Sequence, residues 1–158
     1  MKVRKVQKKD KSRMNEVLDG IYKKGLFKKE EVECALELLE AHLNNSTDYE
    51  HVCCVNEDDV FLGYSCYGKV PLTDAVYDLY WIAVDVNEHN KGIGKKIMEY
   101  IEKDLKSRKA RKLLIETSSQ KIYEPTRMFY IKLNYKEVSR IKDFYSSGDD
   151  RVTYEKLL

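Results

Sequence analysis

This sequence of 158 residues lacks several features that would assign it to a special class. Its 29 Lys and Arg residues stand against 27 Asp and Glu, so it has no basic excess of the kind typical of nucleic-acid binders. No apolar run follows the basic start MKVRKVQKKDKSR, and none elsewhere approaches the length of a bilayer span. We therefore expect one cytoplasmic domain over residues 1–158, without a nucleic-acid or membrane partner.

Cysteine and histidine are too few and too scattered for a disulfide framework or a metal site. No two of the four cysteines have C-x-x-C spacing, and a chain of this length can bury a core without disulfides. The three histidines do not form a recognisable ligand set. His51 and Cys53 lie two apart, but no third group orients them for nucleophilic catalysis. We expect free thiols and no metal.

Hydrophobic periodicity predicts a mixed α/β chain with the element order βααβββαβαββ. Helices are expected after Asp10 as N-cap, from about Lys28, after Gly94, and from Pro125 to Asn134, with Gly25 ending the first. Strands are expected at Lys2–Gln7, His51–Val55, Val60–Tyr67, Ala75–Asp85, Leu113–Thr117, Tyr135–Ile141 and Val152–Leu157.

The stretch Tyr77–Ile101 predicts a strand, a polar turn and an amphipathic helix in succession. Unpaired N–H groups and the helix dipole favour anions at such a helix start. Gly92 and Gly94 leave the backbone open to a diphosphate, and Lys91 and Lys95 add positive charge. Two glycines before a helix are equally typical of an ordinary tight turn, so this motif alone leaves both interpretations open.

Spacing excludes two other kinds of phosphate loop. A Walker-type loop needs Gly at position 89 and Ser or Thr at position 96, where this chain has His89 and Lys96. A dinucleotide-binding fingerprint needs a third small residue at position 97, which is Ile97. The turn is therefore neither a Walker loop nor a dinucleotide fingerprint.

Two blocks together resemble the GNAT family of N-acetyltransferases. HNKGIG at His89–Gly94 is similar to the family's pyrophosphate loop, Gln/Arg-x-x-Gly-x-Gly/Ala, and TRMFYIKLNY at Thr126–Tyr135 is similar to its Ala-x-x-Phe-Tyr-x-x-x-Gly-Phe segment. The resemblance implies a mostly antiparallel sheet of six or seven strands with splayed central strands and four helices. It also implies acetyl-CoA as cofactor and direct transfer of its acetyl group to an amine.

Four positions depart from the family pattern. His89 replaces Gln or Arg, Tyr123 stands where many members have Asn, Thr126 replaces Ala, and Asn134 replaces Gly. Asn tolerates the left-handed conformation, so the last change costs little. By resemblance, the cofactor would be bound by Ile82, Ala83, Val84, His89, Asn90, Lys91, Gly92, Ile93, Gly94, Lys95, Tyr123, Thr126 and Phe129.

The resemblance also implies roles for three residues in the chemistry. Tyr130 matches the family's proton donor, and a phenol with a pKa of about 10 is protonated at neutral pH. Asp78 matches the position where some members carry a Glu base, and Glu116 on the next strand is its rival. A carboxylate is a poor base for an ammonium unless burial raises its pKa, so substrate orientation or a salt bridge is an equal alternative for both.

Aromatic and acidic residues are expected to gather on the acceptor side, where they suit a cationic amine. Packing of the sheet is the simpler explanation for any single one of them. The group is Tyr64, Tyr67, Tyr77, Tyr80, Trp81, Phe144, Tyr145, Asp78, Glu116, Asp149 and Asp150; the candidates for substrate contact are Tyr64, Tyr80, Trp81, Tyr145 and Asp149.

The sequence leaves three functions open. The first is an acetyl-CoA-dependent N-acetyltransferase for a small-molecule or peptide amine, acting as a monomer or homodimer. The second is a non-catalytic acyl-CoA-binding module, which the departures at His89 and Tyr123 permit. The third is modification of a protein lysine or N-terminus.

Overall fold

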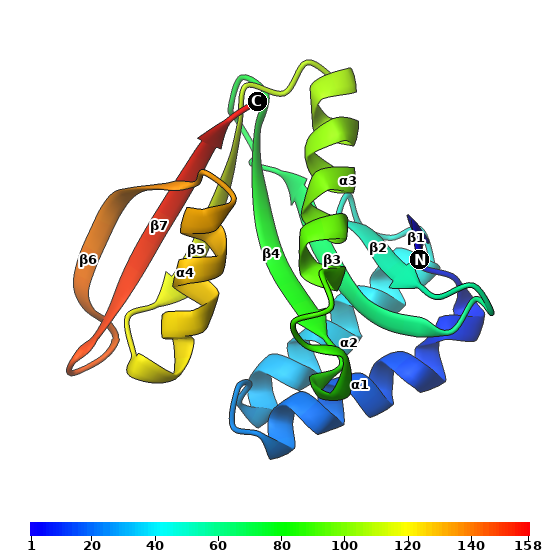
Figure 1. The fold of residues 1–158 in the computed structure, drawn as a ribbon. Helices are drawn as coiled ribbons and strands as arrows, with labels where there is room; N and C mark the ends of the chain where they lie inside the picture. Colours follow the sequence, from blue (N-terminus) through cyan, green and yellow to red (C-terminus); the bar gives the residue numbers. More distant parts are fainter.

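A computed structural model describes residues 1–158, and its centre is one seven-stranded sheet in the order β1-β2-β3-β4-β5-β7-β6 (Figure 1). Only β4 and β5 pair in parallel, and the other neighbours are antiparallel. The predicted mixed, mostly antiparallel sheet is therefore confirmed. The strands are β1 (Lys2–Lys5), β2 (Glu50–Val55), β3 (Phe61–Lys69), β4 (Val76–Val84), β5 (Lys112–Ser118), β6 (Lys136–Ser146) and β7 (Asp149–Leu157).

Four α-helices cover the two faces of the sheet, and the predicted element order is confirmed. They are α1 (Lys11–Lys23), α2 (Lys29–Leu43), α3 (Ile93–Ser107) and α4 (Glu124–Lys132). Helices α1 and α2 lie on one face, and α3 and α4 lie on the other (Figure 1). Short 3-10 turns are η1 (Lys8–Asp10), η2 (Val86–Glu88) and η3 (Lys121–Tyr123). None of the helices is both long and apolar enough to cross a bilayer.

The end of α1 follows the prediction, and the helix starts directly after Asp10 as predicted, but the expected side-chain cap is absent. Gly25 is left-handed at φ 69°, and the N–H of Leu26 bonds to the C=O of Ile21, which closes the helix with a glycine terminator. Asp10 was expected to cap the helix, but its carboxylate pairs with Arg4 at 2.7 Å and accepts the N–H of Gln7 at 2.8 Å. The carboxylate of Asp10 therefore binds the partly buried guanidinium of Arg4 instead of capping α1.

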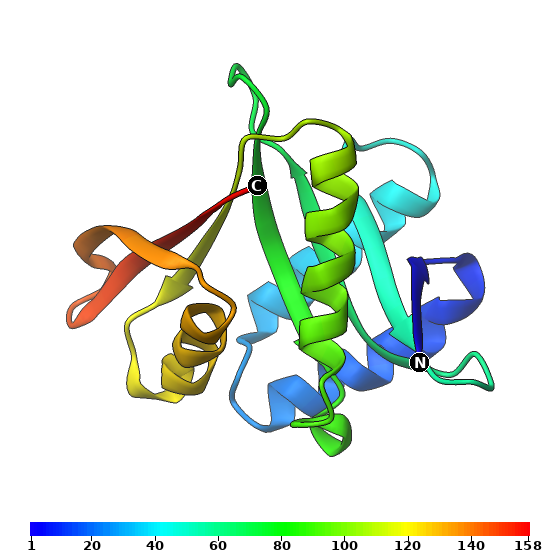
Figure 2. The same cartoon turned by 45° about the horizontal axis from the view of Figure 1, so that its top comes forward.

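The two central strands diverge part-way along their length. Strands β4 and β5 pair only from Val76 with Lys112 to Leu79 with Ile115, and then separate (Figures 1 and 2). A β-bulge lies at the same point: on β3, Cys66 and Tyr67 pair with Trp81 and Leu79, which leaves Tyr80 as the extra residue. The backbone of β4 beyond Leu79 therefore faces the opening without a strand partner on its β5 side.

Each face of the sheet has its own hydrophobic core. The α3 and α4 side includes Leu79, Ile93 and Tyr130. The α1 and α2 side includes Tyr64 and Ala83. The opening between β4 and β5 lies between these cores, so a group placed there can meet side chains from both.

Candidate active site

The bulge at Tyr80 decides which side chains meet at the opening. Leu79 packs in the core on the α3 side, whereas Trp81 packs on the α1 and α2 side. In a regular strand these two residues would share one face, because side chains alternate with a period of two. The extra residue therefore brings Trp81 to the same face as Asp78.

The start of α3 leaves backbone donors beside the opening. Its first hydrogen bond joins the N–H of Lys96 to the C=O of Gly92 at 3.0 Å, so the N–H groups of residues 93–95 precede the helical ladder. Lys91 pairs with Glu88 at 3.0 Å, and Lys95 lies 3.8 Å from Glu99. The anion-binding potential of this turn therefore comes mainly from its backbone.

The two glycines of the turn have different roles. Gly92 has a φ of 79°, and a Cβ added there would meet no atom within 4 Å. A Cβ on Gly94 would lie 3.2 Å from Phe129 Cζ and 3.9 Å from Ile82 Cδ1. Gly92 supplies a backbone conformation beside open space, while Gly94 allows α3, α4 and β4 to approach closely. Asn90, with a φ of 63°, helps to shape the same turn.

The remaining residues expected at the cofactor belong to the same region but are partly engaged in packing. Ile93 and Ala83 are buried in the two cores, and Thr126 is half-buried in the first turn of α4. The carbonyl of Val84 lies 3.1 Å from Nε2 of His89. This contact accounts for His89 structurally, because its imidazole holds the end of β4 against the turn.

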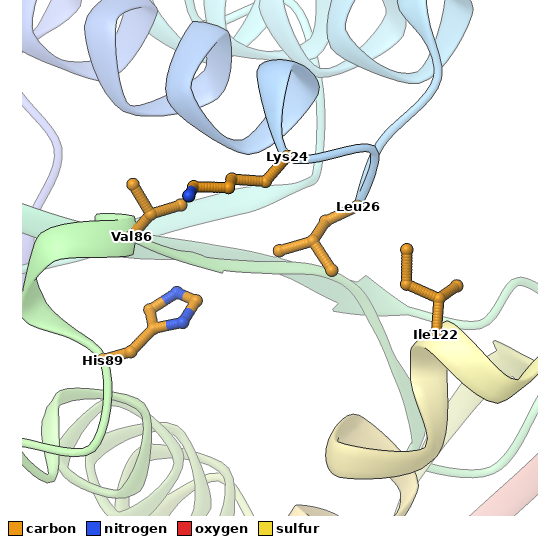
Figure 3. Close-up of a pocket in the computed structure, with 5 residues that line it drawn as sticks. All are labelled: Lys24, Leu26, Val86, His89 and Ile122. Carbon is orange, nitrogen blue, oxygen red and sulfur yellow. The ribbon is translucent and has the colours of Figure 1, made fainter.

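A cavity of about 370 Å³ lies beside this turn (Figure 3). Its lining residues come from the α1–α2 loop, the β4–α3 connection and η3, and they are Lys24, Leu26, Val86, His89 and Ile122. Apolar side chains form most of the wall, and Lys24 and His89 are the basic residues among them. The cavity therefore lies at the mouth of the opening between β4 and β5, and segments from both sides of that opening line it.

Tyr130 is buried in α4, with 3% of its surface exposed. Its ring packs near Phe129, Tyr135 and Tyr154, with centroids 5.4, 6.0 and 6.2 Å away. Burial raises the pKa of its phenol, so the hydroxyl keeps its proton at neutral pH. Its hydroxyl makes no hydrogen bond within the chain, so it is free to serve a ligand.

Asp78 and Glu116 lie on adjacent strands close to the point of divergence. Burial, and then the neighbouring Glu116, raises the pKa of Asp78 to about 6. Glu116 is more exposed, at 46% of its side chain, and its Oε1 lies 3.6 Å from Nη1 of Arg151. Asp78 has no cationic partner, so it is the carboxylate whose environment better suits a base near neutral pH.

Aromatic residues border these carboxylates. Trp81 packs on Phe27 with ring centroids 5.3 Å apart, and the hydroxyl of Tyr49 donates to that of Tyr80 at 3.0 Å. Burial and then Glu116 raise the pKa of Tyr145, which places its phenol close to that carboxylate. We call Asp78, Trp81, Glu116 and Tyr145 the acceptor face.

Several residues expected on the acceptor side lie elsewhere. Tyr67 and Tyr77 belong to the α3 side, where the hydroxyl of Tyr67 donates to Asp104 at 3.0 Å, so that expectation was wrong for both. Tyr64 is fully buried beneath α1 and α2. Sheet packing explains these three tyrosines.

The acidic pair at the start of β7 is also engaged within the chain. Asp149 is buried and accepts the hydroxyl of Ser118, while Asp150 pairs with Arg140 at 3.3 Å. Phe144 packs beneath Arg151, whose guanidinium carbon is 4.4 Å from the ring centroid. These contacts join β7 to β5 and to β6 beside the acceptor face.

Sequence reasoning missed the contribution of the α1–α2 loop. Leu26 lines the cavity and Phe27 covers Trp81, yet no motif marks either residue. The apolar character of the pair next to Gly25 was the only signal. Ile122 likewise enters the cavity from a segment that the sequence assigns to no motif.

The profile of the acetyltransferase (GNAT) family matches residues 16–134, which is most of the chain. The chain belongs to the GNAT family. A crystal structure from Desulfovibrio desulfuricans, assigned to the GNAT family of acetyltransferases, is similar with a TM-score of 0.89 and 35% identity over 98% of this chain and 97% of that one. No curated protein sequence matches significantly.

More distant GNAT structures share the fold. An aminoglycoside 6'-N-acetyltransferase complexed with coenzyme A has a TM-score of 0.74 at 16% identity, covering 99% of this chain and 97% of that one. The ribosomal-protein-S18-alanine N-acetyltransferase of Escherichia coli has a TM-score of 0.76 at 14% identity, covering 98% and 92%. The same GNAT fold therefore accompanies acceptors of different chemistry.

Proposed function

We propose that residues 1–158 form one N-acetyltransferase domain that transfers the acetyl group of acetyl-CoA directly to an amine. The observation that carries this proposal is the placement of Asp78, with a pKa raised to about 6, at the point where β4 leaves β5. Membership of the GNAT family supports the reaction class. Coenzyme A in the distant aminoglycoside enzyme supports the choice of cofactor.

The turn before α3 fits the pyrophosphate of coenzyme A. Open space around Gly92 and the unpaired N–H groups of residues 93–95 suit a diphosphate, because backbone donors and the helix dipole both favour negative charge. Beyond Leu79, the free edge of β4 at residues 82–84 suits the pantetheine arm. When bound, acetyl-CoA supplies the thioester whose carbonyl the amine attacks.

Asp78 is proposed to accept a proton from the incoming ammonium, directly or through a water molecule. Its pKa of about 6 leaves it ionised at pH 7.5, yet far more basic than an ordinary carboxylate. Glu116 is the alternative base. Its ion pair with Arg151 favours a role in orienting the amine instead.

Tyr130 is proposed as the general acid. Burial raises the pKa of its phenol, so the hydroxyl carries its proton at neutral pH. It can donate that proton to the thiolate as the thioester breaks, because the same apolar surroundings disfavour a free thiolate. The tyrosine then regains its proton from solvent or from the site.

The acceptor is proposed to be a primary amine that carries positive charge before it reacts. Trp81 and Tyr145 offer aromatic surface, and Asp78 and Glu116 offer carboxylates, a combination that recognises ammonium groups.

Four free cysteines, three of them buried, support a reducing, cytoplasmic environment.

Two measurements test the proposal. Isothermal titration should detect binding of acetyl-CoA, and the absence of binding at millimolar cofactor would refute the assignment. Thiol release is then measured with kanamycin, spermidine, benzylamine, a peptide with N-terminal alanine and an acetyl-capped lysine peptide. Release with any amine supports the enzyme, whereas tight cofactor binding with a silent panel favours a non-catalytic binding module.

A further inference from the structure

Tyr123 joins the two halves of the molecule across the mouth of the opening. Its hydroxyl donates to the carbonyl of Leu26 at 2.7 Å, across 97 positions of sequence. Tyr123 belongs to η3, just before α4, and Leu26 belongs to the loop between α1 and α2. Burial raises the pKa of Tyr123 to about 12, so its phenol retains the proton that it donates.

The α1–α2 loop is held from both sides of the opening. On the β4 side, Phe27 packs against Trp81 with centroids 5.3 Å apart. On the α4 side, the bond from Tyr123 holds the preceding residue, Leu26. The side chain of Leu26 lines the cavity opposite His89 and Ile122 (Figure 3). The loop thus forms one wall of the cavity through Leu26 and contacts Trp81 of the acceptor face through Phe27.

We propose that Tyr123 is a positioning residue for the acceptor: its bond to Leu26 holds the α1–α2 loop, and through Phe27 the indole of Trp81, in place. This inference rests on the proposed acetyltransferase function. It gives Tyr123 a role other than contact with the cofactor, because its hydroxyl is already committed to a protein carbonyl. Loss of the bond frees the loop and disorders the wall against which the amine binds.

The variant Tyr123→Phe keeps the ring and removes only the donor. Tyr22→Phe is the matched control, because Tyr22 lies near the end of α1 beside the same loop, is exposed, and makes no side-chain hydrogen bond. Hydrogen–deuterium exchange of residues 21–29 in the free protein reports the loop. Titration with coenzyme A reports the cofactor site, and steady-state kinetics with the fastest amine of the panel report the acceptor.

Tyr123→Phe should show faster exchange over residues 21–29 and a Kd for coenzyme A within threefold of wild type. Its KM for the amine should rise by about 3- to 10-fold, which matches the loss of one net hydrogen bond. The kcat should change less than KM, and Tyr22→Phe should match wild type throughout. Unchanged exchange, a larger rise in the Kd for coenzyme A, or an unchanged KM each overturns the proposal. Failure of the wild type to bind coenzyme A or release thiol refutes the enzyme itself, and the exchange measurement is independent of that outcome.

Discussion

The carboxyl group of Asp78 gives the proposed mechanism a distinctive pH dependence. The side chain is half-buried beside the opening, accepts no hydrogen bond from the chain, and lies near Glu116. Burial is the larger cause of its raised pKa, and the like charge of Glu116 is the smaller one. Together they raise the pKa from 3.8 to about 6.

A base must be ionised to accept a proton, so kcat/KM should rise with pH through the pKa of Asp78. With a pKa of about 6, roughly one-tenth of the carboxyl groups are ionised at pH 5, and nearly all are ionised at pH 7.5. The rate at pH 5 should therefore be about one-tenth of the plateau. Removal of the base in Asp78→Asn should lower the plateau by about 10²- to 10⁴-fold.

Glu116→Gln separates the two candidate bases. Removal of its negative charge lowers the pKa of Asp78, so the rising limb moves to lower pH. The limb should stay above pH 3.8, because burial, the larger cause, is unchanged. If Glu116 were the base, the same variant would instead lose the plateau rate, and its profile would show no rising limb shifted to lower pH.

The assay is thiol release between pH 5 and pH 9 at saturating acetyl-CoA, with the folded fraction checked by circular dichroism at each pH. A flat profile between pH 5 and pH 7.5 for the folded protein would refute the reasoning about Asp78. So would an Asp78→Asn variant that retains wild-type kcat/KM.

The same shift predicts an effect on stability. In the unfolded chain Asp78 loses its proton near its ordinary pKa, whereas in the folded protein it loses it only near pH 6. Ionisation therefore favours the unfolded state as pH rises from about 4 to 6, and the folded state above pH 6 contains an unfavourable charge. The melting temperature of Asp78→Asn, measured relative to wild type, should therefore be higher at pH 7.5 than at pH 4. An equal difference between variant and wild type at the two pH values would contradict this sign.

Three further predictions follow from single sites. Tyr130→Phe should bind coenzyme A normally but turn over more slowly, and an unchanged kcat from pH 6 to pH 9 would remove the tyrosine from the mechanism. Gly92→Ala should lose about 1–2 kcal/mol in urea unfolding because φ is 79°, whereas Gly92→Asn should lose less; equal losses would argue against backbone strain. Burial and then His42 lower the pKa of His51 to about 4, so wild type should lose stability as pH falls below about 6.5, by about 2 kcal/mol from pH 8 to pH 5 for this group. His51→Phe should reduce that loss, as thermal unfolding at the two pH values would show.

The sequence alone determined the element order and most helix ends, because these depend on local physics. The apolar stripe of α3 appears at helical spacing, and its buried side chains include Ile97 and Ile101. Gly25 and Asn134 both adopt the left-handed conformation expected of helix terminators, with φ of 69° and 66°. The glycine turn before α3 was also readable, since a helix start needs no distant partner to expose its first N–H groups.

Asp10 shows where local reasoning ended. Its position before α1 is typical of an N-cap, but a guanidinium from β1 competes for the same carboxylate. The sequence contains no sign of that competition, because Arg4 reaches Asp10 only after β1 has joined the sheet.

Tertiary structure alone decided the composition of the acceptor face. Strict alternation would place Tyr77 and Trp81 on one face, but the extra residue Tyr80 in the ladder puts Trp81 on the opposite face, which it shares with Asp78. Such a bulge depends on how β3 and β4 pair, and no local pattern marks it. The bond from Tyr123 to Leu26 likewise exists only in the folded protein. It joins two segments that are distant in sequence and that lie on either side of the opening between β4 and β5.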